Sequence, residues 1–291
     1  MMPAPRVLCI AGTDPSGGAG LLADIKSVAA NGGYGMGAVA ALTAQNTRGV
    51  RGVHVPPPSF LADQLHAISD DITIDAVKIG MLGTAEVAAT VGEWLTAVRP
   101  PVVVLDPVMV ATSGDRLLDV EAEVGIRALF DQVDLITPNA PELAVLADVA
   151  TATEWPDLVG QALAVSATYG VLVLAKGGHL GGEVATDALV DAGGRLSDGR
   201  SVVEFAAPRV DTPNTHGTGC ALSSALATLR PQVADWEEAT DRAKRWLSQA
   251  IQHGAELAVG GGHGPVHHFA ELWPTSAKPA ENRVRRAAYG G

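Results

Sequence analysis

The sequence predicts an α/β fold with three layers, in which helices cover both faces of a mostly parallel central sheet. Two observations predict it: short runs of continuous apolar residues recur along the chain, and helical patterns separate them. Strands that are apolar throughout are typical of parallel sheets covered on both faces. The chain has 291 residues, 47% of them hydrophobic, which is enough for one large domain of this kind.

The first half of the chain alternates apolar runs with helical patterns. We expect strands at residues 6–12, 37–44, 49–55, 76–81 and 102–108. We expect helices at residues 21–33, 60–71, 86–98 and about 121–130. The second and third strands flank a short polar segment, which predicts a hairpin. This hairpin would form a small β flap from around Gly37 to Val55.

The second half continues the same alternation. Strands are expected at residues 133–137 and 171–178 and in the strand-rich segment 185–205. Helices are expected to start at Pro141, at Pro156 and near Gly217, and a further helix is expected over residues 235–257. We find no linker, so residues 1–273 are predicted to form one domain. The polar segment 274–291, basic near its end, is predicted to be a flexible tail.

Charge and composition exclude several classes of function. The net charge is −12, and aromatic residues make up 4% of the chain, so neither nucleic acid nor a membrane surface is an expected partner. The two cysteines form no small-scaffold disulfide pattern, which favours a reducing compartment. Neither a signal peptide nor an apolar run of about 20 residues is found. We therefore expect a cytoplasmic protein.

The segment Asn-Thr-His-Gly-Thr-Gly-Cys at residues 214–220 is the most informative in the chain. Its glycines allow close approach of the backbone to a ligand, and a helical pattern follows. Backbone N–H groups would converge at the start of that helix, where an anion such as a transferring phosphoryl group is stabilised. Cys220 would lie in the first helical turn, where the pKa of a thiol is lowered. The alternative is an inert, buried cysteine behind a glycine-rich turn.

This segment resembles the anion-hole motif of the hydroxymethylpyrimidine/phosphomethylpyrimidine kinases, members of the ribokinase-like superfamily. Most sugar kinases of that superfamily have Asp where this chain has Cys220. The resemblance extends in order over nearly the whole chain and leaves out only the tail. It includes residues 11–20, 41–47, 78–82, 106–115, 137–142, 176–179 and 264–269. It implies a ribokinase-like three-layer α/β/α fold with a small β flap.

The resemblance also implies the roles of the catalytic residues and of the pyrimidine site. Cys220 would be the catalytic base, and Gly217, Thr218 and Gly219 would bind the transferring phosphoryl group. Gln45 and Asp24 would hold the pyrimidine, in a site that includes Gly12, Met81 and Val108. A carboxamide such as that of Gln45 complements the donor and acceptor of a 4-aminopyrimidine edge. Alternatively, Gln45 faces water in a turn, and Asp24 is a solvated acid in a first helical turn.

A second implied set of residues would handle magnesium and ATP. Asp106 and Glu142 resemble the family's magnesium-organising groups, and Mg²⁺ favours a few oxygen ligands while it keeps its waters. Asn139, Lys176 and Thr215 would bind the nucleotide. Alternatively, Glu142 is an ordinary acid in the first turn of a helix, and Lys176 is solvated.

The function that the resemblance implies is ATP-dependent phosphorylation in thiamine biosynthesis. The substrates would be 4-amino-5-hydroxymethyl-2-methylpyrimidine and then its monophosphate, with Mg²⁺ as cofactor and ATP as co-substrate. Pyridoxal kinase activity, alone or as a second activity, is the nearest alternative, and a non-catalytic pyrimidine-binding sensor is a remote one. Thr112 stands where the family often has Lys, which puts a phosphate contact there in doubt. A homodimer is left open.

Overall fold

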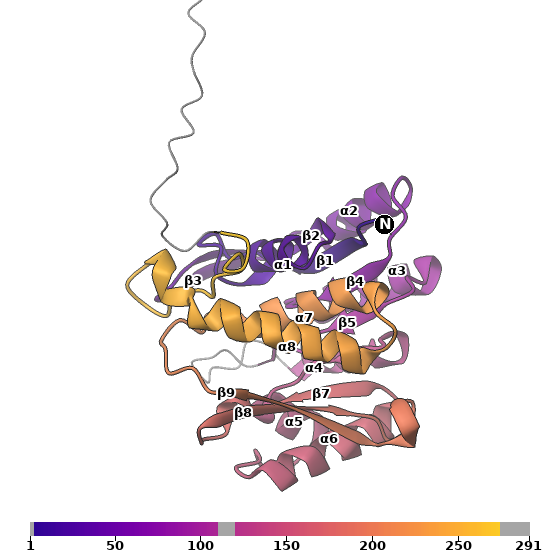
Figure 1. Cartoon of the computed structure of the whole chain (residues 1–291). Helices are drawn as coiled ribbons and strands as arrows, with labels where there is room; N and C mark the ends of the chain where they lie inside the picture. The colour runs from indigo at the N-terminus through magenta and orange to yellow at the C-terminus, as the bar shows by residue number, and fades with distance from the viewer. Residues whose placement is uncertain (1–2, 110–119, 274–291) are drawn as a thin grey trace, which may run out of the picture.

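A nine-stranded sheet forms the centre of the computed structural model, which describes residues 3–109 and 120–273 (Figure 1). The strand order is β3-β2-β1-β4-β5-β6-β7-β8-β9. The strands are β1 Arg6–Gly12, β2 Tyr34–Asn46, β3 Gly49–His54, β4 Ala76–Ile79, β5 Val103–Leu105, β6 Leu135–Ile136, β7 Leu172–Lys176, β8 Val184–Val190 and β9 Val202–Pro208. The pairs from β2 to β7 are parallel, whereas β3, β8 and β9 pair antiparallel with their neighbours. The predicted mostly parallel sheet is confirmed.

Helices cover both faces of this sheet. One face carries α1 Gly20–Ala30, α7 Thr218–Leu229 and α8 Trp236–Gln252, and Figure 1 shows α7 and α8 side by side. The other face carries α2 Pro58–Ser69, α3 Ala85–Val98, α4 Val120–Arg127, α5 Ala140–Ala147 and α6 Trp155–Tyr169. Short 3₁₀ turns are η1 Phe130–Gln132, η2 Gly177–His179, η3 Ser197–Gly199, η4 Arg230–Gln232 and η5 Gly254–Leu257. The three layers expected from the sequence are present.

Alternate residues of the buried strands build two separate core layers. In β1, Leu8 and Ile10 pack in the layer under α2, α3 and α6, while Val7 and Cys9 pack in the layer under α1 and α7. All four are fully buried. This is the expected outcome of side-chain alternation in a strand with apolar residues on both faces.

The flap is smaller than predicted, because one long strand serves two partners. The first part of β2, Tyr34–Ala41, pairs in parallel with β1 in the main sheet. Only Leu42–Asn46 pairs antiparallel with β3, with an irregularity in register between Ala44 and Gln45. The flap therefore begins near Leu42, and the prediction that it begins near Gly37 was wrong.

The predicted boundaries of three other elements also change. The helix predicted over residues 235–257 ends at Gln252, and Gly254 opens a separate 3₁₀ turn. A Cβ at Gly254 would lie 2.9 Å from Asn214 Cβ and from the Pro265 carbonyl oxygen, so the chain packs there too closely for a continued helix with side chains. The strands β5 and β6 are shorter than their apolar runs. Thr112 and residues 274–291, on which the sequence made predictions, lie outside the described residues.

This arrangement places the predicted site residues at one edge of the sheet. The parallel strands β1, β4, β5, β6 and β7 all end there, and the loop before α7 approaches the loop after β1. Ligands bind at this edge in open α/β sheets, beyond the carboxyl ends of the strands. No helix among the described residues has the length and apolar character that crossing a membrane requires.

Candidate active site

The anion loop, residues 214–219, runs into α7 and includes the first two residues of that helix. Gly217 has a φ of 78°, a conformation that favours glycine, and it stands immediately before the first helical residue, Thr218. Thr218 N–H donates to the Thr215 carbonyl at 3.3 Å, which closes the turn. Cys220 lies in the first turn of α7 and is partly exposed. The predicted helix start behind the glycines is confirmed.

Lys176 brings two predicted metal ligands together. Its ammonium lies 2.9 Å from Asp106 Oδ1 and 3.9 Å from Glu142 Oε2. Asp106 follows β5, Lys176 ends β7, and Glu142 lies in the first turn of α5, so three separate elements contribute to the cluster. Thr137, the residue after β6, donates from its hydroxyl to Asp106 Oδ1 at 2.9 Å and restrains that carboxylate. Lys176 is thus paired with acids, and the alternative of a solvated lysine is wrong.

Gly219 joins this charged cluster to the anion loop. A Cβ at Gly219 would lie 3.2 Å from Asp106 Oδ2 and 3.2 Å from Lys176 Nζ. The start of α7 therefore approaches a carboxylate and an ammonium closely, and only glycine leaves that space open. A phosphoryl group there could meet the helix N-terminus and the lysine together.

Glu142 has a structural partner as well as a place in the cluster. Its Oε2 accepts a hydrogen bond from Asn139 N–H at 2.8 Å, and Asn139 Oδ1 accepts one from Glu142 N–H at 2.9 Å. This reciprocal capping box starts α5 and aims Glu142 at Lys176. Burial raises the pKa of Glu142 to about 7, Lys176 opposes the shift, and Asp106 adds to it.

The second carboxylate of the cluster behaves differently. Burial acts to raise the pKa of Asp106, but the charges of Lys176 and Lys78 and hydrogen bonds from Lys176 and Thr137 outweigh it. The pKa of Asp106 is lowered, so this group is an anion at neutral pH.

Asp106 and Glu142 suit Mg²⁺, although two carboxylates do not supply all of its ligands. Within the described residues, no cluster of three or more His, Cys, Asp or Glu side chains could hold a metal. Mg²⁺ is commonly bound by one or two carboxylates together with phosphate oxygens and waters. The donor set of Asp106 and Glu142 fits that pattern, with Lys176 now holding both acids.

The expectation that the helix start lowers the thiol pKa of Cys220 was wrong. Burial raises the pKa of Cys220 to about 11. Lys78 and a backbone hydrogen bond from Gly20 act in the opposite direction, while Asp24 and Asp106 raise the pKa further. The thiol is therefore protonated at neutral pH. Buried surroundings and two nearby acids outweigh the helix terminus here.

Asp24 is buried in a polar contact behind the site. Its Oδ1 lies 2.8 Å from Lys78 Nζ and accepts a hydrogen bond from the Ser224 hydroxyl at 2.9 Å. The Asp24 side chain has no exposed surface, so it is not a solvated helix acid. Its Oδ2 has no hydrogen-bond partner among the described residues. The substrate contact expected of Asp24 stays a prediction, and its present partners are Lys78 and Ser224.

The other residues assigned to the pyrimidine lie at or just beyond the ends of four strands, β1, β2, β4 and β5. Gly12 N–H donates to the Met81 carbonyl at 3.1 Å, and a Cβ at Gly12 would lie 2.6 Å from Met81 Cε. Val108 is half-buried two residues after Asp106. Gln45 is half-buried at the flap, and its Oε1 lies 3.2 Å from the Thr43 hydroxyl. The structure brings Gly12 and Met81 together and shows Gln45 held within the flap.

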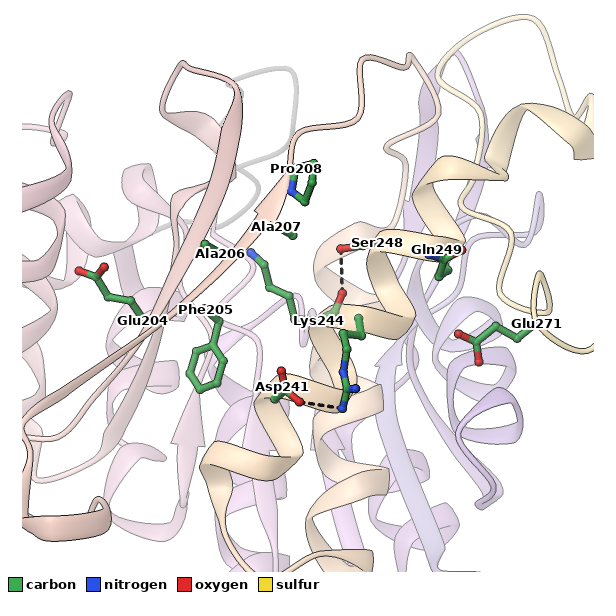
Figure 2. Close-up of a pocket in the computed structure, with 11 residues that line it drawn as sticks. Glu204, Phe205, Ala206, Ala207, Pro208, Asp241, Lys244, Ser248, Gln249 and Glu271 are labelled. Atoms are coloured by element: carbon green, nitrogen blue, oxygen red, sulfur yellow. Dashed lines mark hydrogen bonds and ion pairs between the residues drawn. The ribbon is translucent and has the colours of Figure 1, made fainter.

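An open hollow of about 600 Å³ lies between α8 and β9 (Figure 2). It is lined by Glu204–Pro208 and Glu271 and by Asp241, Lys244, Arg245, Ser248 and Gln249. Lys244 Nζ is already paired there, with Asp187 Oδ2 at 2.6 Å and the Ala185 carbonyl at 2.8 Å. Asp187 Oδ1 accepts from Gly177 N–H at 3.0 Å, directly after Lys176. The hollow is thus connected through Lys244 and Asp187 to the residue after Lys176, but its lining is distinct from the predicted site residues.

Three side chains that contact the site residues were not predicted from the sequence. Lys78 stands inside an apolar run, so a charge in a buried strand was a usable signal. Asp14 and Thr137 gave no such signal, because polar residues after a strand are common in loops. Only the folded chain shows that Asp14 reaches His216 in the anion loop, at 2.8 Å.

A known family matches this chain over most of its length. The phosphomethylpyrimidine kinase family model matches residues 14–267. The chain is 46% identical to the hydroxymethylpyrimidine/phosphomethylpyrimidine kinase of Escherichia coli, covering 92% of this chain and 98% of that enzyme. It is 51% identical to a thiamine biosynthesis multifunctional protein of Corynebacterium glutamicum, covering 91% of this chain. The chain spans about a third, 34%, of that longer relative.

Solved structures of two kinds of kinase are also similar to this chain. The structure resembles the ADP complex of Bacillus subtilis pyridoxal kinase, with a TM-score of 0.83, 30% identity, and coverage of 92% of this chain and 98% of that chain. It also resembles a phosphomethylpyrimidine kinase of Clostridium difficile, with a TM-score of 0.72, 34% identity, and coverage of 85% and 99%.

Proposed function

The chain belongs to the phosphomethylpyrimidine kinase family, and on that premise we propose which reaction it performs. It transfers the terminal phosphoryl group of ATP to 4-amino-5-hydroxymethyl-2-methylpyrimidine and then to the resulting monophosphate, in thiamine biosynthesis. The fold is the ribokinase-like fold of the solved kinases that it resembles. The observation that carries the proposal is Gly219, which holds the start of α7 beside both Lys176 and Asp106.

The anion loop binds the transferring phosphoryl group in this proposal. Gly217, Thr218 and Gly219 present backbone N–H groups at a helix N-terminus, where positive partial charge favours an anion. Phosphoryl transfer depends mainly on positioning and on stabilisation of charge on the phosphoryl oxygens. A loop whose shape depends on close contacts between glycines supplies that positioning.

Asp106 and Glu142 would hold Mg²⁺, and Lys176, Asn139 and Thr215 would bind the nucleotide. The metal supplies charge neutralisation on the phosphate oxygens when it is bound. Lys176 is now paired with Asp106 and Glu142, and its ammonium is free to turn to a phosphate once these acids hold a cation. Glu142, with a pKa of about 7, becomes a full anion when a cation is next to it.

Cys220 would accept the proton of the substrate hydroxyl. Its thiol is a poor base while protonated, and with a pKa of about 11 only a small fraction is thiolate at neutral pH. That fraction is strongly basic, and Lys78 favours it electrostatically. Cys220 is therefore proposed as a base whose contribution grows as the pH rises.

Gln45 would read the aminopyrimidine edge, next to Gly12, Met81, Val108 and Asp24. Its carboxamide presents an acceptor beside a donor, which matches the amino group and ring nitrogen of the substrate. Gln45 is half-buried on the flap, where its Oε1 lies 3.2 Å from the Thr43 hydroxyl. Its amide N–H groups therefore keep hydrogen-bonding capacity for a ligand.

Pyridoxal kinase activity is a second candidate, because one structural observation favours it. The fold matches a pyridoxal kinase from Bacillus subtilis with the TM-score of 0.83 given above, and pyridoxal also carries a hydroxymethyl group. Sequence identity favours the pyrimidine: the E. coli pyrimidine kinase is 46% identical, against 30% for the pyridoxal kinase.

A side-by-side assay tests the proposed function. The purified protein is given ATP and Mg²⁺ with either hydroxymethylpyrimidine or pyridoxal, and ADP release is followed together with the phosphorylated products. We expect the pyrimidine monophosphate to appear first and the diphosphate to follow. Turnover of pyridoxal alone would establish the second candidate and overturn the first. Cytoplasmic location, a homodimer and one domain over residues 1–273 stay predictions.

A further inference from the structure

Asp14 and His216 connect two loops that are far apart in the sequence. His216 Nε2 lies 2.8 Å from Asp14 Oδ2, between the loop after β1 and the anion loop. We propose that Asp14 and His216 are positioning residues that couple pyrimidine binding at the flap to the shape of the anion loop, so that the pyrimidine and the nucleotide bind cooperatively. This inference rests on the proposed function and adds a regulated link between its two halves.

Asp14 is the fixed centre of the loop after β1. Asp14 is 1% exposed, and its carboxylate accepts four hydrogen bonds. Ser16 donates from its N–H and its hydroxyl to Oδ1, at 2.9 and 2.7 Å, and Ala19 N–H donates to Oδ2 at 3.0 Å. His216 completes the set at Oδ2. Both carboxylate oxygens are therefore occupied, and the orientation of His216 is determined by a loop that has little freedom of its own.

Close packing makes the two loops move together. A Cβ at Gly18 would collide with the His216 ring, and a Cβ at Gly217 would collide with the Gly18 carbonyl oxygen. The Gly20 backbone also lies close enough to Cys220, in the first turn of α7, to lower the pKa of its thiol. A displacement of the loop after β1 would therefore be transmitted to Gly217 and Cys220, where the transfer is proposed to occur.

The flap joins the same loop on its other side. Thr43 donates from its hydroxyl to the Thr13 carbonyl at 2.7 Å, and its N–H donates to the Thr13 hydroxyl at 3.3 Å. The Thr43 hydroxyl also lies 3.2 Å from Gln45 Oε1. Thr13 is bonded covalently to Asp14. Consecutive contacts thus lead from Gln45, which is proposed to read the pyrimidine, to His216 in the anion loop.

A second route joins the flap tip to His216 through residues 262–265. His263 N–H donates to the Thr47 carbonyl at 3.0 Å, and Gly262 N–H donates to the Thr47 hydroxyl at 3.2 Å. Two residues further on, His216 N–H donates to the Gly264 carbonyl at 3.1 Å. Both routes from the flap meet at His216, its ring on one and its backbone on the other.

Cooperative binding follows from this connectivity. A pyrimidine held by Gln45 would restrain Thr43 and the loop after β1, and hence the anion loop. The nucleotide would then bind a loop that is already ordered, at a smaller entropic cost. Because coupling between two sites is reciprocal, bound nucleotide would tighten pyrimidine binding by the same factor.

Ligand titrations on His216 variants test the inference. Hydroxymethylpyrimidine affinity is measured by calorimetry without nucleotide and with a saturating, non-hydrolysable ATP analogue and Mg²⁺. We expect the analogue to tighten wild-type binding at least about 5-fold. In His216→Leu the ratio of the two affinities should fall towards one. His216→Gln, which retains an N–H donor in the place of Nε2, should restore it, and His66→Leu on the exposed face of α2 should match the wild type.

Each other outcome overturns the inference. A wild-type affinity that the analogue does not change shows that the sites are uncoupled. Unchanged coupling in His216→Leu removes His216 from the path, and equal weakening of both affinities assigns it a structural role only. If His216→Leu does not fold, Thr43→Val, which removes the contact between the flap and the Thr13 carbonyl, must lower the coupling instead. Wild-type protein that neither binds nor phosphorylates the pyrimidine refutes the proposed function, a separate result.

Discussion

Lys78 Nζ lies 2.8 Å from Asp24 Oδ1 in a pair of side chains that have no exposed surface. Lys78 projects from β4 into the layer that contains Cys9 and α7, and Ser224 of α7 donates to the same carboxylate oxygen. Burial acts to lower the pKa of Lys78, but Asp24, Cys220 and Asp106 outweigh it and raise the pKa. A permanent positive charge is thus buried next to the helix that begins at the anion loop.

The first prediction concerns the stability that this pair provides. Lys78→Met leaves Asp24 as an unpaired buried charge, which typically costs about 3–5 kcal/mol of folding free energy. The double variant Lys78→Met with Asp24→Leu removes both charges and should regain most of that loss. Urea unfolding of the two single variants and the double variant measures the coupling. Single losses that simply add in the double variant would show that the two residues do not stabilise each other.

The fold could be predicted from the sequence because its strands are apolar on both faces. The runs at residues 6–12 and 171–178 indicated buried parallel strands, and β1 and β7 lie there. The flap boundary could not be predicted, because β2 is one continuous strand that changes partners after Ala41. The pattern of apolar residues along a strand does not show which other strand it pairs with.

The site could be predicted only in part. The glycines of the anion loop and the charges at the ends of β5 and β7 are local signals, and the structure brings Gly219, Asp106 and Lys176 together. The thiol pKa of Cys220 depends on burial and on the charges of Asp24 and Asp106, which come from other elements. An argument from the helix start alone leaves these contributions out, and it therefore gave the wrong direction for the pKa of Cys220.

The second prediction uses the narrow space at Gly219. Gly219→Ala puts a methyl group 3.2 Å from both Asp106 Oδ2 and Lys176 Nζ, in the place assigned to the phosphoryl group. We expect kcat to fall at least about tenfold, a barrier increase of about 1.4 kcal/mol. The matched control is Gly160→Ala on α6, where a Cβ meets no atom within 4 Å and should stabilise the helix by about 0.5–1 kcal/mol. Equal activity of both variants would show that Gly219 is not at the transfer point.

The third prediction tests Gln45 as the reader of the pyrimidine. Gln45→Leu keeps the approximate volume and leaves the polar edge of the substrate unpaired, at a cost of about 1–3 kcal/mol. Pyrimidine affinity should therefore fall roughly 5- to 150-fold in a calorimetric titration, while the melting temperature changes little. Asn46→Leu, next in the same strand, serves as a control. Unchanged binding in Gln45→Leu would mean that another residue reads the ring.

The fourth prediction is a pH profile that depends on Cys220. With a thiol pKa of about 11, the thiolate fraction rises about tenfold per pH unit from 7 to 9. If the thiolate accepts the hydroxyl proton, kcat for the alcohol should rise with pH over that range. Cys220→Ala should lose roughly 10²–10⁴-fold in rate and also lose that slope. A wild-type rate that does not change with pH, together with an alanine variant that keeps over a tenth of the activity, would show that Cys220 is not the catalytic base.

The last prediction is that one active site performs both phosphorylations and releases the monophosphate between them. The described residues contain one anion loop and one pair of Asp106 and Glu142 around Lys176, so both steps would use the same groups. In the second step the nucleophile is a phosphate oxygen, which is substantially ionised near neutral pH. It has little need of a base, and a thiolate at Cys220 would repel it. The second step should therefore depend less on Cys220 than the first.

Glu142 supplies the matched comparison for that prediction. Glu142→Gln can keep the capping box with Asn139, because glutamine also accepts the backbone hydrogen bond, but it removes a carboxylate proposed to hold Mg²⁺. Both steps should slow by a similar factor in Glu142→Gln. Cys220→Ala should retain a larger share of its rate with the monophosphate than with the alcohol. Time-resolved product analysis of the wild type should show the monophosphate rise and then decay. If only monophosphate accumulates while ATP is in excess, the enzyme catalyses a single step, because a site competent for both would consume its own first product.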